Sequence, residues 1–144
     1  MTVAAILRHK GSTVTAVAPE VTVAVIAATL TQHRIGAVPV LAADDMLIGI
    51  VSERDVVRCL AANGAPALRM TAEQIMTRSP RVATLATTVA EAMAIMTDGR
   101  FRHLPVVAGG RMIGLVSIGD VVKARIMAQE TEVDCLKAYV AGVA

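Results

Sequence analysis

Aromatic residues are almost missing from this chain of 144 residues, which has one Phe, one Tyr and no Trp although 55% of its residues are hydrophobic. Proteins that hold single-stranded nucleic acid usually stack its bases on aromatic rings, so this composition argues against that class. The formal net charge of +2 is also too small for a protein that binds a phosphate backbone. Nucleic acid is therefore not an expected partner.

Long hydrophobic runs are missing as well, despite a mean hydropathy of +0.62. A helix that crosses a membrane needs about 20 consecutive apolar residues, and the longest unbroken runs, residues 23–28 and 37–43, are much shorter. The apolar patch at residues 3–7 has its cations after it, which is not the order found in a secretory signal. We therefore expect a cytoplasmic protein without a membrane span.

Cysteine is scarce, and the two present, Cys59 and Cys135, are far apart and lack the spacing of a metal or redox motif. Reduced, packed thiols are the expected state in the cytoplasm. His9 and His33 have no carboxylate or cysteine at ligand spacing, so no metal site is predicted.

The most informative feature that is present is an internal repeat. A shift of 66 residues places residues 22–42 on residues 88–108 with nine identities, and a shift of 65 places residues 48–57 on residues 113–122 with seven. So many ordered matches with a single gap indicate two similar modules. The predicted divisions are an N-terminal arm (1–13), a first module (14–62), a linker (63–80), a second module (81–127) and a C-terminal helical tail (128–144).

Each module is predicted to fold in the order β-α-β-β-α, which gives an α+β protein. Thr88 and Glu91 form a capping-box pattern before the helix of the second module, and Gly109-Gly110 is a favourable hairpin turn. Val133, Leu136 and Val140 predict an amphipathic helix in the tail, which could pack on its own modules or on a partner subunit. The expected strands are 13–17, 37–41 and 46–52 in the first module, and 81–85, 103–107 and 112–117 in the second; the expected helices begin at 22, 52, 88 and 117.

Two matched junctions between strand and helix contain the strongest candidate site. Each has the pattern Gly-x-Val-Ser-x-x-Asp, at residues 49–55 and 114–120. Ser-x-x-Asp at a helix start can be a simple cap. The same geometry can also bind a ligand, because a helix N-terminus favours phosphate and a carboxylate there can accept hydrogen bonds from a ribose diol. The repetition of Gly, Ser and Asp favours a ligand modestly.

These junctions, together with the segments HRIGAVPV (33–40) and RFRHLPV (100–106), resemble tandem cystathionine-β-synthase (CBS) domains over residues 14–125. The likeness is greatest to stand-alone bacterial CBS pairs. It implies a Bateman module, in which two CBS modules are related by pseudo-two-fold symmetry, and a homodimer that acts in signal transduction on an unknown effector. It also implies a bound adenosine ligand, AMP, ADP, ATP, NAD or S-adenosylmethionine, in clefts between the modules.

The resemblance also implies roles for individual residues. Arg54 and Gly119 depart from the family pattern, which often has Ser or Thr there; Arg54 could contact phosphate instead, whereas Gly119 supplies no contact. The remaining candidates are grouped by role: Asp55 and Asp120 for ribose hydroxyls, Ser52 and Ser117 for ribose or phosphate, Ile35, Gly36 and Ala37 for adenine, Arg102 and His103 for phosphate, and Lys10, Thr15 and Thr84 in segments that close over the base.

The expected function is therefore that of a nucleotide-binding regulatory protein without catalysis. The sequence contains no Ser/His/Asp set, metal cluster or Walker-type phosphate loop that would indicate an enzyme. The alternative is a protein-interaction module in which Ser-x-x-Asp is a cap and the nucleotide pockets are vestigial.

Overall fold

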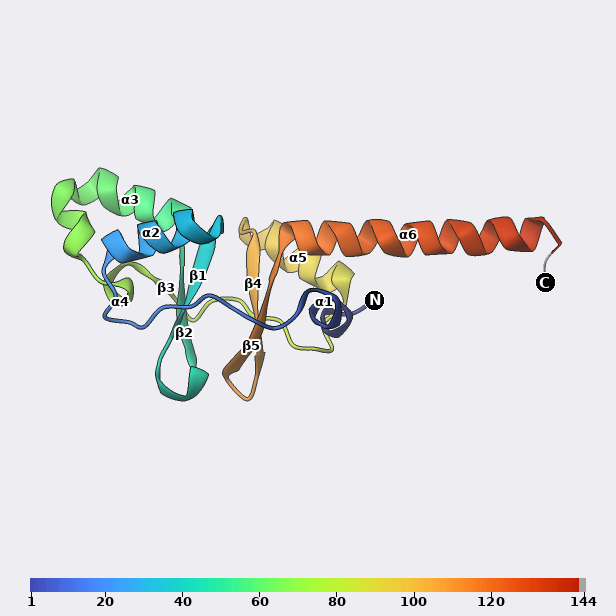
Figure 1. Ribbon diagram of the computed structural model, residues 1–144, viewed down its shortest axis with the longest axis horizontal. Coiled ribbons are helices and arrows are strands. Elements are labelled where there is room, and N and C mark those ends of the chain that lie inside the picture. The colour runs from blue at the N-terminus through green and yellow to red at the C-terminus, as the bar shows by residue number, and fades with distance from the viewer. Residues whose placement is uncertain (143–144) are drawn as a thin grey trace.

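Two antiparallel hairpins stand next to each other at the centre of the computed structural model, which describes residues 1–142 (Figure 1). In the first module, β1 (Ala37–Leu41), β2 (Leu47–Ser52) and the short β3 (Thr77–Arg78) form a sheet in that order; in the second, β4 (His103–Ala108) pairs with β5 (Arg111–Ser117). A bridge between Met46 and Arg111 joins the two hairpins near their turns. The predicted α+β fold with two modules is confirmed.

Helices surround the hairpins, and the last one extends well beyond them (Figure 1). Four helices start where predicted, and their N-caps are Thr22, Ser52, Thr88 and Ser117, each of which accepts a hydrogen bond from the backbone N–H three residues later. The capping box is reciprocal at Ser52 and Ser117. The helices are α1 (Val3–Lys10), α2 (Val23–His33), α3 (Glu53–Asn63), α4 (Ala72–Ile75), α5 (Val89–Gly99) and α6 (Ile118–Val140), with 3₁₀ turns at Ala43–Asp45 and Ala65–Arg69.

The first predicted strand of each module is wrong: residues 13–17 and 81–85 each make one parallel bridge rather than a strand. Val17 pairs with Val40 and Ala83 pairs with Val106. The next rung of each ladder would need the backbone N–H of Pro39 or Pro105, and proline has none. A proline at the same place in both hairpins therefore blocks the ladder on the N-terminal side of each bridge.

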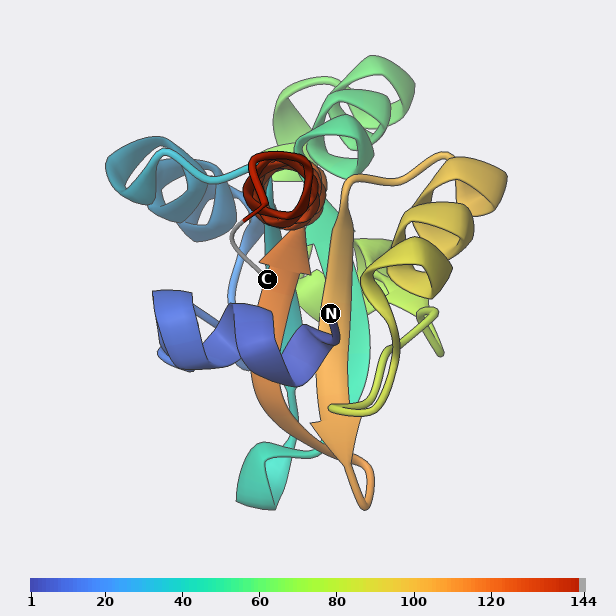
Figure 2. The ribbon, with the colours of Figure 1, turned by 90° about the vertical axis from the view of Figure 1, so that its right-hand side faces the viewer.

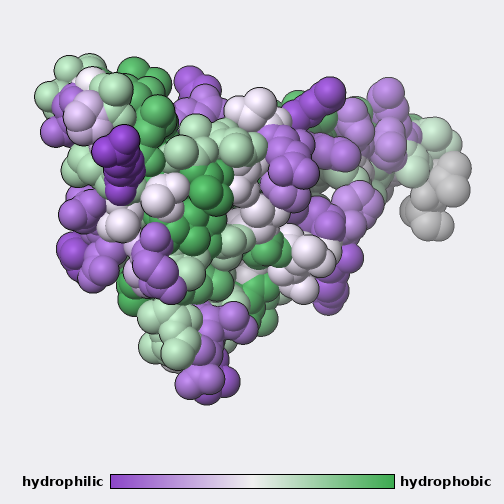
Figure 3. Space-filling view, turned by 60° about the vertical axis from the view of Figure 1, so that its left-hand side comes forward, coloured by the Kyte–Doolittle hydropathy of each residue, from purple (hydrophilic) through white to green (hydrophobic). Residues whose placement is uncertain are grey.

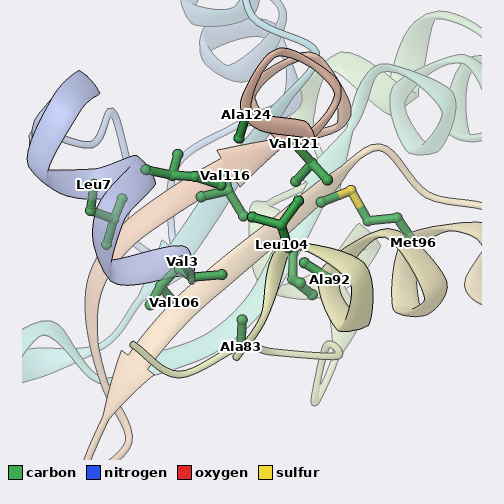
Figure 4. Packing of buried hydrophobic residues seen from close by; sticks show 12 residues of the cluster. Val3, Leu7, Ala83, Ala92, Met96, Leu104, Val106, Val116, Val121 and Ala124 are labelled. Atoms are coloured by element: carbon green, nitrogen blue, oxygen red, sulfur yellow. The ribbon is translucent and has the colours of Figure 1, made fainter. Parts of the chain in front are cut away.

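The N-terminal arm forms α1 and packs on the second module, not the first. Figure 4 shows Val3 and Leu7 of α1 among Leu104, Val116 and other buried side chains of that module. Figure 2 shows α1 lying across β5. In the same way, Ala72 of α4 belongs to the core of the first module. Each core is thus completed by a segment that precedes the other module in the chain.

The surface is partly apolar. A hydrophobic band crosses the face drawn in Figure 3, and the helices of the first module expose Val25 (52%) and Val57 (63%).

Within residues 1–142, no helix combines the length and the apolar character needed to cross a membrane.

Candidate functional site

The two matched junctions have nearly the same local geometry. Asp55 Oδ2 accepts hydrogen bonds from Ser52 N (2.9 Å) and Ser52 Oγ (3.0 Å), and Asp120 Oδ2 accepts one from Ser117 N (2.9 Å). In return, each serine Oγ accepts the N–H of its aspartate, at 3.2 and 3.1 Å. The capping interpretation therefore describes both junctions correctly. It leaves Asp55 Oδ1 without a hydrogen-bond partner among the described residues.

The glycine that precedes each serine is explained by packing. A Cβ on Gly49 would lie 2.4 Å from Met76 Sδ and 3.0 Å from the carbonyl oxygen of Thr77. A Cβ on Gly114 would lie 2.7 Å from Leu7 Cδ1. Each glycine leaves room for a side chain from the other half of the chain, Met76 at Gly49 and Leu7 at Gly114. The glycines are therefore not evidence for a ligand.

A cleft of about 710 Å³ opens at the first junction. Ligand pockets in proteins are typically about 300–1,000 Å³, so the cleft can take a nucleotide. Its walls come from the residue before β1, from β2 and α3, from β3 and the segment after it, and from the end of α5 to the start of β4 in the second module. The lining residues are Gly36, Ile50, Ser52, Glu53, Arg54, Asp55, Arg58, Thr77, Ser79, Pro80, Arg81, Gly99, Arg100, Phe101, Arg102 and His103.

Positive charge dominates this cleft, which is lined by five arginines and two carboxylates. Residues 1–142 contain one ion pair, between Lys10 and Asp120, so none of the five arginines is paired with a carboxylate. Unpaired guanidinium groups that converge on one cleft are well suited to the oxygens of a phosphate. The arginines are Arg54, Arg58, Arg81, Arg100 and Arg102.

His103 lies between the two junctions. A Cβ on Gly36 would lie 2.9 Å from His103 Cε1 and 3.3 Å from Glu53 Oε1, so this glycine allows the imidazole to approach β1. Burial lowers the pKa of His103, an effect that Glu53 and Asp120 oppose only in part. The imidazole is therefore neutral at pH 7, and it can donate or accept a hydrogen bond without adding charge to the cleft.

The second junction is closed by Lys10, the last residue of α1. Lys10 Nζ donates to Asp120 Oδ2 at 2.7 Å and to the carbonyl oxygen of Leu115 at 3.0 Å. Burial alone would raise the pKa of Asp120, but the hydrogen bonds from Lys10 and Ser117 outweigh it and hold that pKa below its usual value. The carboxylate that corresponds to Asp55 is thus already bound to a cation of its own chain.

Among the described residues, the second junction has an ion pair and the first has none, because a different residue lies beside each aspartate. Leu7 packs against Gly114 as Met76 packs against Gly49; three residues further along the chain, Lys10 corresponds to Ser79. Ser79 lines the open cleft, and its short neutral side chain cannot form an ion pair with a carboxylate. The long cation at one position and the serine at the other make the two sites unequal.

The ion pair of Lys10 predicts a dependence of stability on pH. Because Asp120 has a lowered folded pKa, its contribution to stability is complete above the ordinary aspartate pKa of about 3.9 and is lost as the pH falls through the folded value. Thermal unfolding from pH 6 to pH 2 should show wild type losing its advantage over Lys10→Met in the acid range. Arg8→Met, which removes an exposed cation from the same helix, should parallel wild type; equal acid sensitivity of all three would contradict the prediction.

The predicted site residues divide into three groups in the structure. Lys10, Ser117 and Asp120 form the closed junction. Thr15, Ile35, Ala37 and Thr84 lie outside the cleft lining: Ala37 is buried in β1, and Thr84 forms a turn with Thr87. Six predicted residues lie together in the open cleft: Gly36, Ser52, Arg54, Asp55, Arg102 and His103.

Several cleft residues escaped the sequence interpretation. Arg58 follows Arg54 by one helical turn, a spacing that places both on the same side of α3, and this signal was available in the sequence. Arg81 lies in the segment ending at Thr84 that was expected to close over the base, whereas Glu53 had no comparable signal. Phe101, the single phenylalanine, also lines the cleft.

Sequence comparison identifies relatives over most of the chain. The family model described as "CBS domain" matches residues 5–62 and 72–126. The mitochondrial CBS domain-containing protein CBSX3 of Arabidopsis thaliana is 39% identical over 79% of this chain and 57% of its own length. A 17.7 kDa protein of Acidianus ambivalens is 33% identical over 75% of this chain and 65% of its own length. The chain thus spans about three-fifths of the length of these curated relatives.

Comparison with solved structures also identifies CBS-domain proteins. A CBS-domain containing protein from Agrobacterium tumefaciens is 44% identical, with a TM-score of 0.82 over 87% of this chain and 99% of its own. CBSX2 of Arabidopsis thaliana, solved in complex with AMP, is 27% identical, with a TM-score of 0.72 over 81% of this chain and 90% of its own.

Proposed function

This chain belongs to the CBS domain family, and from that premise we propose that it is a regulatory protein that senses a phosphorylated adenosine compound in the cleft beside Asp55. The relative CBSX2, solved with AMP, supports an adenosine ligand. The proposed ligands are AMP, ADP, ATP or NAD. S-adenosylmethionine is less suited, because its sulfonium charge would meet five unpaired arginines.

One observation carries this proposal: Asp55 faces the same cleft as the unpaired arginines. Asp55 Oδ1 is free to accept hydrogen bonds from a ribose diol, while guanidinium groups of α3 and of the segment before β4 can bind phosphate oxygens. Ile50, Pro80 and Phe101 supply apolar surface for a base. The cleft therefore offers the three kinds of contact that a nucleotide needs.

Regulation would follow from where the cleft lies. Its walls come from both modules, so a bound ligand would favour the relative orientation of the modules in which both walls contact it. We propose that this shift is transmitted to an effector protein in the cytoplasm, and that the protein itself performs no catalysis.

Calorimetric titration tests the proposal. Purified protein is titrated with AMP, ADP, ATP, NAD and S-adenosylmethionine, and with adenosine as the control that lacks phosphate. We expect at least one phosphorylated ligand to bind with a Kd between micromolar and millimolar and with one site per chain, because Lys10 closes the second junction. If none of the phosphorylated ligands binds, the sensor function is wrong.

The alternative function, an interaction module with vestigial pockets, is favoured by the closed junction at Asp120. The same titration separates the two functions, since a vestigial module binds none of the ligands. Incubation of each ligand with the protein, followed by chromatography of the products, would reveal turnover and contradict the non-catalytic assignment.

A further inference from the structure

The outer part of α6 has no support from the rest of the described chain. Ala124 is the last buried residue of the helix, and residues 125–140 are all exposed. Figure 1 shows this segment projecting away from both modules, and Figure 2 shows it end-on in front of them. An isolated helical segment of this length is marginally stable in water. Packing of its apolar side chains against a partner would stabilise it.

The exposed apolar side chains of α6 follow a heptad repeat. With Ile126 assigned to position a, one stripe of the helix contains positions a and d over nearly three heptads. Most of these side chains are strongly exposed, from 42% for Val122 to 82% for Val140. The stripe consists of Val122, Ile126, Gln129, Val133, Leu136 and Val140.

This stripe faces away from the modules. The two residues of α6 that are buried against the second module, Val121 and Ala124, fall at positions c and f of the same heptad register. Positions c and f lie on the side of a helix opposite to a and d. A second helix can therefore reach the stripe while each pair of modules stays on the outside.

We propose that α6 pairs with α6 of a second copy as a parallel, two-stranded coiled coil. The occupied a positions are β-branched (Ile126, Val133 and Val140) and Leu136 is at d, the combination that favours parallel dimers. Parallel pairing also places Arg125 near Glu130 of the partner subunit, and Glu132 near Lys137 of the partner subunit. Both pairs have opposite charges, and symmetry forms each pair twice.

The opposite orientation is disfavoured by the same charges. Antiparallel pairing along the full exposed stripe would centre near residue 131, and would place Glu130 and Glu132 beside the same residues of the other copy. Parallel alignment instead brings Gln129 against Gln129 of the partner subunit, where the two amides can bond each other and fix the register. This interface does not depend on the nucleotide, so its test is independent of the proposed function.

The first test measures assembly by sedimentation equilibrium. We expect wild type to have twice the 15.0 kDa mass of the chain, and Val133→Asp to weaken the dimer at least tenfold. Thr131→Asp, which adds the same charge at outward position f, should dimerise like wild type. Circular dichroism and thermal unfolding verify that the modules stay folded. A monomeric wild type, or equal dimerisation of both variants, overturns the proposal.

The second test measures orientation by disulfide cross-linking. Gln129→Cys is made together with Cys135→Ser, because Cys135 is exposed on α6; mild oxidation should then give a covalent dimer. Thr131→Cys in the same background, on the outer face, should give little. A dimer that persists in sedimentation but does not cross-link through position 129 has another interface, and this result overturns the coiled coil.

Discussion

Replacement of Asp55 by alanine is expected to lower the affinity for the phosphorylated adenosine ligand by at least tenfold. Asp55 is one of the two carboxylates that line the open cleft, and its Oδ1 is free of internal partners among residues 1–142. A hydrogen bond to a charged group contributes about 1.5–3 kcal/mol, and a tenfold change in Kd corresponds to about 1.4 kcal/mol. Loss of the ribose contacts should thus be clear in calorimetry against wild type.

The internal repeat supplies a matched control, Asp120→Ala. Both substitutions remove the N3 half of a reciprocal capping box, so both should lower stability through the helix start, and Asp120→Ala also removes the ion pair with Lys10. Asp120 is held by Lys10 at the closed junction, so its loss should leave ligand affinity nearly unchanged. Equal loss of affinity in the two variants would contradict the assignment of the site to the Asp55 cleft, even if nucleotide binding itself is confirmed.

The features that could be predicted from the sequence are those encoded locally. The hairpin strands and the four capped helix starts depend on residues within a few positions of one another, and the structure confirms them. The failed prediction of two first strands has a cause outside the two segments: Pro39 in β1 and Pro105 in β4, the strands that face them, lack a donor that each added strand needs. The strand pattern of 13–17 and 81–85 does not reveal which residues would face them.

Gly119 already distinguishes the second junction from the first in the sequence, but the ion pair at that junction could not be predicted, because it is a contact across the whole chain. Lys10 and Asp120 are 110 positions apart, and the repeat that relates the modules does not include α1. Resemblance to the family places Lys10 in a segment that closes over the base and leaves the second junction weaker only through Gly119. The structure adds that Lys10 donates to Asp120, a carboxylate of its own chain.

The phosphate contacts are the second large effect that the cleft implies. The double variant Arg54→Gln/Arg102→Gln should weaken AMP binding by about a hundredfold, since each guanidinium contributes a charge-assisted contact of about 1.5–3 kcal/mol. Both arginines line the cleft, Arg54 from α3 on one wall and Arg102 from the residue before β4 on the other. Glutamine retains the size and polarity of the side chain, so the change isolates its charge.

Adenosine is the ligand control for this double variant. It lacks phosphate, so its weaker binding should be nearly equal in wild type and variant, and the affinity difference between AMP and adenosine should collapse. Arg8→Gln/Arg69→Gln removes the same charge from exposed positions outside the cleft and should preserve that difference. If the arginine variants weaken adenosine as much as AMP, the arginines do not bind phosphate, because they then act on the shape of the cleft rather than through charge.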